Sequence, residues 1–262
     1  MVKESPIKQA LKGLYIIFRP LFDPVQFVKN IISYPEYIRD IITYRKLIAY
    51  KKPWAFSYYP ILSDKTSTSS FDPHYMYLGM WAFRAIVKNN PEEHVDVGSQ
   101  INWVTCLSSI TRVVFIDIRP FTGNVPNLSS VAGSVLKMPY GDQTVQSLSC
   151  LHVAEHIGLG RYGDPLNPTG TRDAIRELSR VLSIGGHLYF ALPVGKPKTC
   201  FNAHRIHDSL DIARWFAEEG LSLEDFAAVD DAGTFHQVAS PADYREASYA
   251  CGMFHLVRVK PE

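Results

Sequence analysis

Several features are scarce or absent in this sequence, and each absence excludes a class of protein. The 262 residues include only four widely spaced cysteines and no Cys-x-x-Cys pair. We therefore expect reduced thiols in a cytosolic protein, with neither a zinc knuckle nor a dithiol redox motif. No uncharged apolar run of about 18 residues occurs, which argues against a membrane-spanning helix. The early apolar stretch is broken by two charges and a proline, which argues against a signal peptide.

Net charge is small, at +1, and charged residues make up 20% of the chain. This balance argues against a nucleic-acid partner, which requires a basic surface, and against an acidic solvating chain. Apolar residues make up 46% of the sequence, which is enough for a buried core. The charge is unevenly distributed, because residues 1–52 hold ten Lys and Arg against four Asp and Glu, a net charge of +6.

The first 70 residues differ in composition from the rest. Aromatic and β-branched residues are interleaved with the basic residues of segment 1–52 on predicted helices. One interpretation is a helical extension that packs on the main domain or on a second subunit; the other is peripheral contact with an anionic membrane at its inner, cytoplasmic face. The polar segment Ser63–Ser70 is predicted to be a flexible linker. We therefore predict an extension with linker, residues 1–70, and a main domain, residues 71–262.

After a predicted helix over Tyr75–Asn89, short apolar strands alternate with amphipathic helices. This alternation predicts an α/β fold with a parallel, doubly wound sheet covered on both faces. In such sheets ligands bind beyond the carboxyl ends of the strands. The helices are predicted at Ile101–Ile110, Thr171–Leu182 and Asp208–Glu219. The strands are predicted at His94–Gly98, Val113–Asp117, Val131–Leu136, Val145–Val153, His187–Val194, Leu223–Val229 and Phe254–Val259.

Two residues at consecutive strand ends are typical of a nucleotide site. Gly98 ends the first strand, where the missing side chain lets the backbone approach a ligand. Asp117 ends the second strand about 20 residues later, where an acid accepts hydrogen bonds from a ribose diol. The full Gly-x-Gly-x-x-Gly motif is absent. This absence counts against a nicotinamide-dependent oxidoreductase.

The order of these segments resembles the class I S-adenosylmethionine-dependent methyltransferases over about residues 72–260. The resemblance implies a Rossmann-like, seven-stranded methyltransferase sheet whose last strand is antiparallel, and S-adenosylmethionine as cofactor. The matching segments are Asp96-Val-Gly98-Ser99, Asp117, Gly133-Ser-Val-Leu-Lys-Met-Pro-Tyr140, Leu148-Ser-Cys-Leu-His-Val-Ala-Glu-His-Ile157 and Arg176-Glu-Leu-Ser-Arg-Val-Leu-Ser-Ile-Gly-Gly-His-Leu188.

The same resemblance implies a set of cofactor contacts, with two departures from the family. The first loop has one glycine, Gly98, where the family usually has two or three. Ser134 stands where an acid is common, although a serine hydroxyl still accepts a hydrogen bond from the adenine amine. The implied cofactor-binding residues are Asp96, Gly98, Ser99, Asp117, Ser134, Val135, Leu136 and His152.

Two further segments, Ile157–Asp164 and Phe201–Arg205, look like a branch of unknown function noted in nematodes and bacteria. Bacterial members of that branch are often associated with surface-polysaccharide genes. The likeness implies a glycan or other small acceptor and a role in polysaccharide biosynthesis. The predicted substrate-binding residues are Glu155, Arg161, Tyr162, Asn202, His204 and Arg205.

The candidate bases follow the fourth predicted strand. A hydroxyl nucleophile needs a base near its proton, and His152 and His156 share one face of a helical turn with Glu155. Asp164 lies in a Gly- and Pro-rich loop and is the third candidate. The His-x-x-Glu-His string also fits a zinc motif, but it leaves a strand end instead of lying on a long helix. No metal is therefore predicted.

Three functions are consistent with these observations. The first is methyl transfer to a hydroxyl, or another nucleophile, of a small or glycan-type acceptor. The second is a non-catalytic binding or scaffold module that has kept the fold, and the third is a nicotinamide-dependent oxidoreductase. The predicted pair of terminal strands favours the first over the third. The sequence leaves the acceptor and the oligomeric state open.

Overall fold

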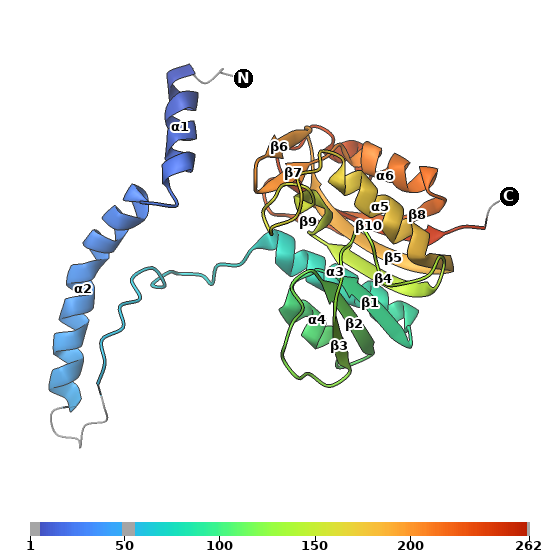
Figure 1. Cartoon of the computed structure of the whole chain (residues 1–262). Helices are drawn as coiled ribbons and strands as arrows, with labels where there is room; N and C mark the ends of the chain where they lie inside the picture. Colours follow the sequence, from blue (N-terminus) through green and yellow to red (C-terminus); the bar gives the residue numbers. More distant parts are fainter. Residues whose placement is uncertain (1–5, 49–55, 261–262) are drawn as a thin grey trace. The chain divides into compact units, whose positions relative to one another are not determined.

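The computed structural model describes residues 6–48 and 56–260 (Figure 1). The chain divides into two compact units, Met1–Ser70 and Phe71–Glu262. Within the basic segment 1–52, residues 1–5 and 49–52 lie outside the described residues. None of the described helices is both long enough and apolar enough to cross a membrane.

The first unit contains two helices, α1 (Pro6–Phe18) and α2 (Pro24–Ile48). The Asp23 carboxylate accepts hydrogen bonds from the Val25 and Gln26 amides and so caps the start of α2. No residue of α2, which is described throughout, is buried. Residues 56–72 form neither helix nor strand, and Lys65 of this segment pairs with Glu36 of α2 at 2.5 Å.

The second unit is built on an eight-stranded sheet. β1 to β5 run parallel, whereas β10 lies antiparallel between β5 and β8. The predicted sheet with an antiparallel last strand is confirmed, with β9 as a short additional edge strand. The spatial order is β3 (Leu128–Ala132), β2 (Arg112–Asp117), β1 (Glu93–Val97), β4 (Val145–Leu151), β5 (Leu182–Val194), β10 (Ala250–Arg258), β8 (Leu221–Val229) and β9 (Phe235–His236).

Helices cover both faces of the sheet, because the central strands are apolar on both sides. The residues of one apolar core include Ile175 of α5 (Gly170–Val181) and Phe216 of α6 (Ser209–Glu218). The other core includes Trp81 of α3 (Pro73–Asn89) and Leu107 of α4 (Ile101–Leu107). A separate hairpin, β6 (Lys198–Cys200) with β7 (His204–Ile206), follows β5.

Several predicted boundaries differ from the structure: α4 ends at Leu107 instead of Ile110, β5 begins at Leu182 instead of His187, and β10 begins at Ala250 instead of Phe254. Two further differences affect the site. The third strand ends at Ala132 and does not reach residue 136, because a turn begins at Gly133 in which the Ser134 hydroxyl oxygen accepts a hydrogen bond from the Leu136 amide. Residues 152–156 do not form a regular helical turn. His152 adopts a left-handed backbone conformation, with φ +56°, and a single 3₁₀ turn, Ala154–His156, follows.

Candidate cofactor and acceptor site

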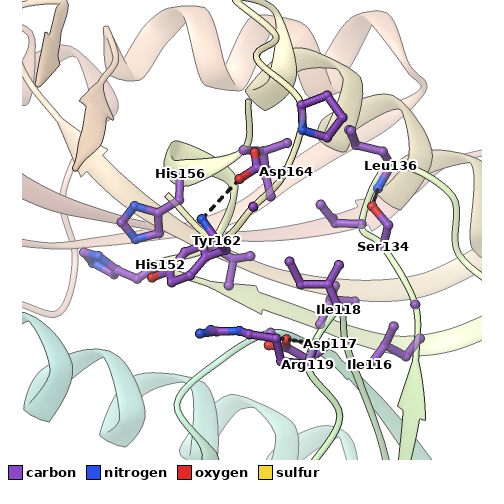
Figure 2. Close-up of a pocket in the computed structure, with 18 residues that line it drawn as sticks. Ile116, Asp117, Ile118, Arg119, Ser134, Leu136, His152, His156, Tyr162 and Asp164 are labelled. Atoms are coloured by element: carbon purple, nitrogen blue, oxygen red, sulfur yellow. Dashed lines mark hydrogen bonds and ion pairs between the residues drawn. The ribbon is translucent and has the colours of Figure 1, made fainter. Parts of the chain in front are cut away.

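A cavity of about 500 Å³ opens where β1, β2 and β4 end, and the loop after β3 closes one side (Figure 2). The strand order changes direction between β1 and β4, which is the switch point at which parallel sheets bind ligands. The His152 and His156 side chains lie on one side of the pocket, and Ser134 and Leu136 lie on the other (Figure 2). The volume lies in the usual range for small-molecule sites.

Gly98 and Asp117 line this cavity together. Gly98 has φ +68°, and a β-carbon there would lie 3.2 Å from a methyl group of Val153 and 3.6 Å from Oδ2 of Asp117. The other carboxylate oxygen of Asp117, Oδ1, accepts a 2.7 Å hydrogen bond from the Arg119 amide. A bare backbone and a carboxylate oxygen therefore face the same space.

Asp96 and Ser99 lie beneath the cavity and do not line it. Asp96 is completely buried, where its carboxylate accepts hydrogen bonds from the Ser149 hydroxyl and from the Ser99 amide at 3.0 Å. Burial raises the pKa of Asp96 to about 6. The Ser99 hydroxyl turns away from the cavity and accepts a 3.1 Å hydrogen bond from the Leu151 amide. The two side chains thus tie β1 to β4 below the site.

The network continues into the sheet through His94. Its Nδ1 lies 2.7 Å from the Ser147 hydroxyl, and its Nε2 lies 2.8 Å from the Ser149 hydroxyl. Burial lowers the pKa of His94 to about 3, so the ring is neutral at physiological pH. These hydrogen bonds hold β1 against β4, and the neutral His94 ring adds no second charge beside the buried Asp96 carboxylate.

The loop after β3 supplies an apolar slot. Ser134, Val135 and Leu136 line the cavity as predicted from the resemblance, and Ile118 lines the facing wall. Ile118 is 48% exposed and Leu136 is 37% exposed, so both present apolar surface to the cavity. Gly133 is required here, because a β-carbon would lie 2.7 Å from Ile116.

A buried cluster of ionisable groups follows β4. Oε1 of Glu155 lies 3.0 Å from Nδ1 of His152 and 3.7 Å from Nε2 of His156, and Nε2 of His152 lies 3.1 Å from the Cys251 sulfur. Burial by itself would lower the pKa of His152, but Cys251 and Glu155 outweigh burial and raise that pKa well above its ordinary value. Glu155 is completely buried and does not line the cavity.

His156 and Asp164 line the cavity with fixed orientations. Nδ1 of His156 donates a 2.5 Å hydrogen bond to the Ala203 carbonyl. The Asp164 carboxylate accepts a hydrogen bond from the Tyr162 amide at 3.3 Å (Figure 2). It also accepts one from the Gly158 amide at 2.5 Å, and the two bonds close the loop around it. Two of the three candidate bases, His156 and Asp164, are therefore held by backbone groups at the cavity wall.

Tyr162 is the one predicted substrate-binding residue that lines the cavity. Its ring lies 4.4 Å from the guanidinium carbon of Arg119, which is a cation–π contact across the wall. Arg161 turns outward and donates to the Ala203 carbonyl. Sequence reasoning did not select Ile118 or Arg119, although both directly follow Asp117 and could have been found from the strand end.

The other predicted substrate-binding residues lie outside the cavity wall. Asn202 is exposed between β6 and β7, and the ring of His204 packs against Tyr249 at 5.0 Å. Arg205 is buried and donates to the carbonyls of Ile157 and Asn167, so its guanidinium holds the 157–167 loop in place. The Arg205 guanidinium therefore serves the backbone of this loop, and its side chain does not line the cavity.

Comparison with known proteins supports the fold. A family described as "Caenorhabditis protein of unknown function, DUF268" matches residues 128–226, and no curated protein sequence matches the chain. The N-methyltransferase NodS from Bradyrhizobium japonicum WM9 is 16% identical, with a TM-score of 0.51 over 72% of this chain and 98% of that chain. Geranyl diphosphate methyltransferase is 12% identical, with a TM-score of 0.51 over 70% and 78%.

One similar structure has a different described activity. The [4+2]-cyclase SpnF is 14% identical, with a TM-score of 0.50 over 71% of this chain and 81% of that chain. Structural similarity at these sequence identities establishes the fold only. The reaction has to be inferred from the residues of the site. The second unit has the Rossmann-like fold of the class I S-adenosylmethionine-dependent methyltransferases.

Proposed function

We propose that the second unit binds S-adenosylmethionine and transfers its methyl group to a hydroxyl, or another nucleophile, of a small acceptor. The observation that carries this proposal is the pair formed by Gly98 and Asp117. Their bare backbone and carboxylate oxygen face one cavity at the switch point of a methyltransferase-type sheet. Asp117 would accept hydrogen bonds from the two ribose hydroxyls.

The residues around this pair fit the rest of the cofactor. The adenine ring would lie between Ile118 and Leu136, with its amine near the Ser134 hydroxyl. The single-glycine loop does not block the site, because the Ser99 side chain is bound to Leu151 beneath the cavity. The cofactor supplies an electrophilic methyl group, so the protein has to orient the acceptor and exclude water.

The acceptor would approach the wall formed by His152, His156, Tyr162 and Asp164. The Asp164 carboxylate has about four lone-pair positions. It can therefore accept a hydrogen bond from a hydroxyl of the methyl-acceptor molecule in addition to those from its two backbone partners. Both ring nitrogens of His152 have close partners, Glu155 and Cys251. We therefore place His156 and Asp164 nearer to the transferred proton and His152 in a supporting role.

A glycan-type acceptor and a role in polysaccharide biosynthesis extend this proposal. They rest on the likeness of segments 157–164 and 201–205 to the nematode and bacterial branch. These two segments contact each other beside the cavity, because Arg161 donates to the Ala203 carbonyl and Arg205 donates to the Ile157 carbonyl. Sequence differences in either segment would therefore change the shape of the acceptor wall.

The alternative is a binding or scaffold module without catalysis. The [4+2]-cyclase neighbour shows that this fold also occurs in a protein that is not described as a methyltransferase, so the fold by itself does not decide against this alternative. For the first unit, we propose peripheral contact of residues 1–52 with an anionic membrane at its cytoplasmic face. The net charge of +6 and the absence of buried residues in α2 support that contact.

Thermal unfolding with separate additions of S-adenosylmethionine, S-adenosylhomocysteine and NAD tests the cofactor. A ligand at about 100 times its dissociation constant adds roughly 2.7 kcal/mol of stability. For a domain of this size that corresponds to a rise of roughly 5–10 °C in the midpoint. A rise with the two adenosyl compounds and none with NAD is expected. Unchanged midpoints at millimolar ligand would refute the cofactor and leave the scaffold alternative.

A further inference from the structure

Three potential metal ligands from distant parts of the sequence meet beside the cavity. His74 lies at the start of α3, His152 follows β4, and Cys251 lies in β10. One ligand atom of each lies within 4.8 Å of the other two, and the closest pair, Nε2 of His152 and Sγ of Cys251, is 3.1 Å apart. In tetrahedral zinc sites with bonds of about 2.0–2.3 Å, ligand atoms are separated by roughly 3.3–3.6 Å.

The surroundings hold these side chains in place. The Asp72 carboxylate caps α3 by accepting from the His74 amide at 2.9 Å, and the His74 ring stacks on Tyr249 at 5.0 Å. His152 has a positive φ at the strand end, a conformation uncommon outside glycine that occurs at ligand sites. His74 is therefore held by its helix cap and ring contact, and Cys251 is held by the pairing of β10 with β5 and β8.

Glu155 provides an independent indication of a cation. It is completely buried, and neither of its carboxylate oxygens makes a hydrogen bond among the described residues, although Oε1 lies within ion-pair distance, 3.0 Å, of Nδ1 of His152. Metal-bound histidines commonly donate their second ring N–H to such a carboxylate. A divalent ion with one thiolate and this carboxylate would make the buried cluster neutral overall.

We propose that His74, His152 and Cys251 bind a divalent transition-metal ion, with zinc as the ion that this nitrogen and sulfur set fits best. The ion would replace the proton between Nε2 of His152 and the Cys251 sulfur, which is released to solvent. This site differs from the His-x-x-Glu-His motif of the sequence, because Glu155 orients a ligand and His156 turns to the Ala203 carbonyl.

Three protein ligands leave a fourth position, as in catalytic zinc sites. His152 lines the cavity, so a fourth ligand would come from there. This step rests on the proposed methyl transfer. A thiol or hydroxyl of the methyl-acceptor molecule would bind the metal at the fourth position, and the metal would lower the pKa of that group. A nucleophilic role for the Cys251 thiol itself does not fit, because Cys251 is 0% exposed.

Cobalt substitution of the full-length, untagged protein tests the site. After chelator treatment, one equivalent of Co²⁺ should give the visible bands of tetrahedral cobalt and the near-ultraviolet band of a thiolate ligand. Zinc should abolish both bands with a stoichiometry of one per chain. The variant Cys251→Ala should lose the thiolate band, and His74→Gln should weaken cobalt binding at least tenfold. The controls Cys150→Ala, another fully buried thiol, and His255→Gln should bind as the wild type does.

The outcome separates this proposal from the cofactor proposal, because the titration contains no S-adenosylmethionine. No stoichiometric cobalt or zinc binding by the wild type would overturn the metal site. An unchanged thiolate band in Cys251→Ala would overturn it as well. If Cys251→Ala does not fold, the half-buried His74→Gln variant decides, since wild-type affinity there would exclude His74 as a ligand.

Discussion

Oδ2 of Asp117 lies 3.6 Å from the position that a β-carbon on Gly98 would occupy. The two residues end neighbouring parallel strands, and Gly98 donates its amide to the Ile116 carbonyl at 2.8 Å. This backbone pairing keeps the glycine beside the carboxylate. A ligand that binds the carboxylate must therefore pass along the bare backbone of Gly98.

Gly98→Ala should block adenosyl-ligand binding and destabilise the fold. The substitution places a β-carbon 3.2 Å from Val153 on a residue with φ +68°, and backbone strain of this kind costs roughly 1–3 kcal/mol. Gly185→Ala is the matched control, because Gly185 has φ +72° but no atom within 4 Å of its β-carbon position. Both variants should lose stability in denaturant titrations, and only Gly98→Ala should lose ligand binding.

Asp117→Ala should abolish detectable cofactor binding and leave the fold intact. Hydrogen bonds to a charged group contribute roughly 1.5–3 kcal/mol, which corresponds to about a 10–100-fold change in affinity for each one lost. Asp117→Asn keeps an oxygen for the Arg119 amide and should bind with intermediate affinity. Calorimetric titration with S-adenosylhomocysteine measures both. Wild-type affinity in Asp117→Ala would contradict the ribose assignment.

Tyr162→Ala should weaken ligand binding more than Tyr162→Phe does. The ring of Tyr162 packs against the Arg119 guanidinium at 4.4 Å, and phenylalanine keeps this contact whereas alanine removes it. We expect about a 3–10-fold loss of affinity in the alanine variant, since such contacts contribute roughly 0.5–1 kcal/mol and the ring also fills the cavity wall. Equal affinities in the two variants would show that the ring plays no part.

His94 should make the protein less stable as pH falls. Its folded pKa is about 3 and its unfolded pKa is 6.5, so the stability present above pH 6.5 is lost progressively toward pH 3. Between pH 6.5 and pH 5 this loss amounts to roughly 2 kcal/mol. His94→Gln should lose about 2 kcal/mol less than the wild type between pH 7.5 and 5.0 in urea titrations. Parallel pH profiles would show that His94 is not buried as a neutral ring.

Deletion of residues 1–52 should release the protein from anionic vesicles. The segment carries a net charge of +6, and each basic residue near an anionic surface contributes about 1 kcal/mol. Full-length protein should sediment with phosphatidylserine-containing vesicles at low salt and dissociate at high salt. Vesicles of phosphatidylcholine alone are the control. If the full-length protein never sediments with the anionic vesicles, the membrane proposal fails.

Much of the main domain follows from local sequence patterns. The apolar runs that became β1, β2 and β4 and the periodic helix α5 are encoded over short windows, because period-2 and period-3.6 patterns need only neighbouring residues. The nearness of Gly98 and Asp117 could also be predicted, since consecutive parallel strands end at one edge. The narrow turn at Gly133 was missed, because an apolar run does not show where a strand ends.

The sequence by itself therefore determined the fold class and the residues that end the strands at the cavity. Only the tertiary structure decided which way the polar side chains face. The Ser99 hydroxyl accepts from the Leu151 amide of β4, Arg205 anchors a loop, and His152 reaches Cys251, which is 99 positions away along the chain. The physical reason is that such contacts depend on strand register and backbone conformation at single residues, such as the positive φ of His152, which no short window of sequence specifies.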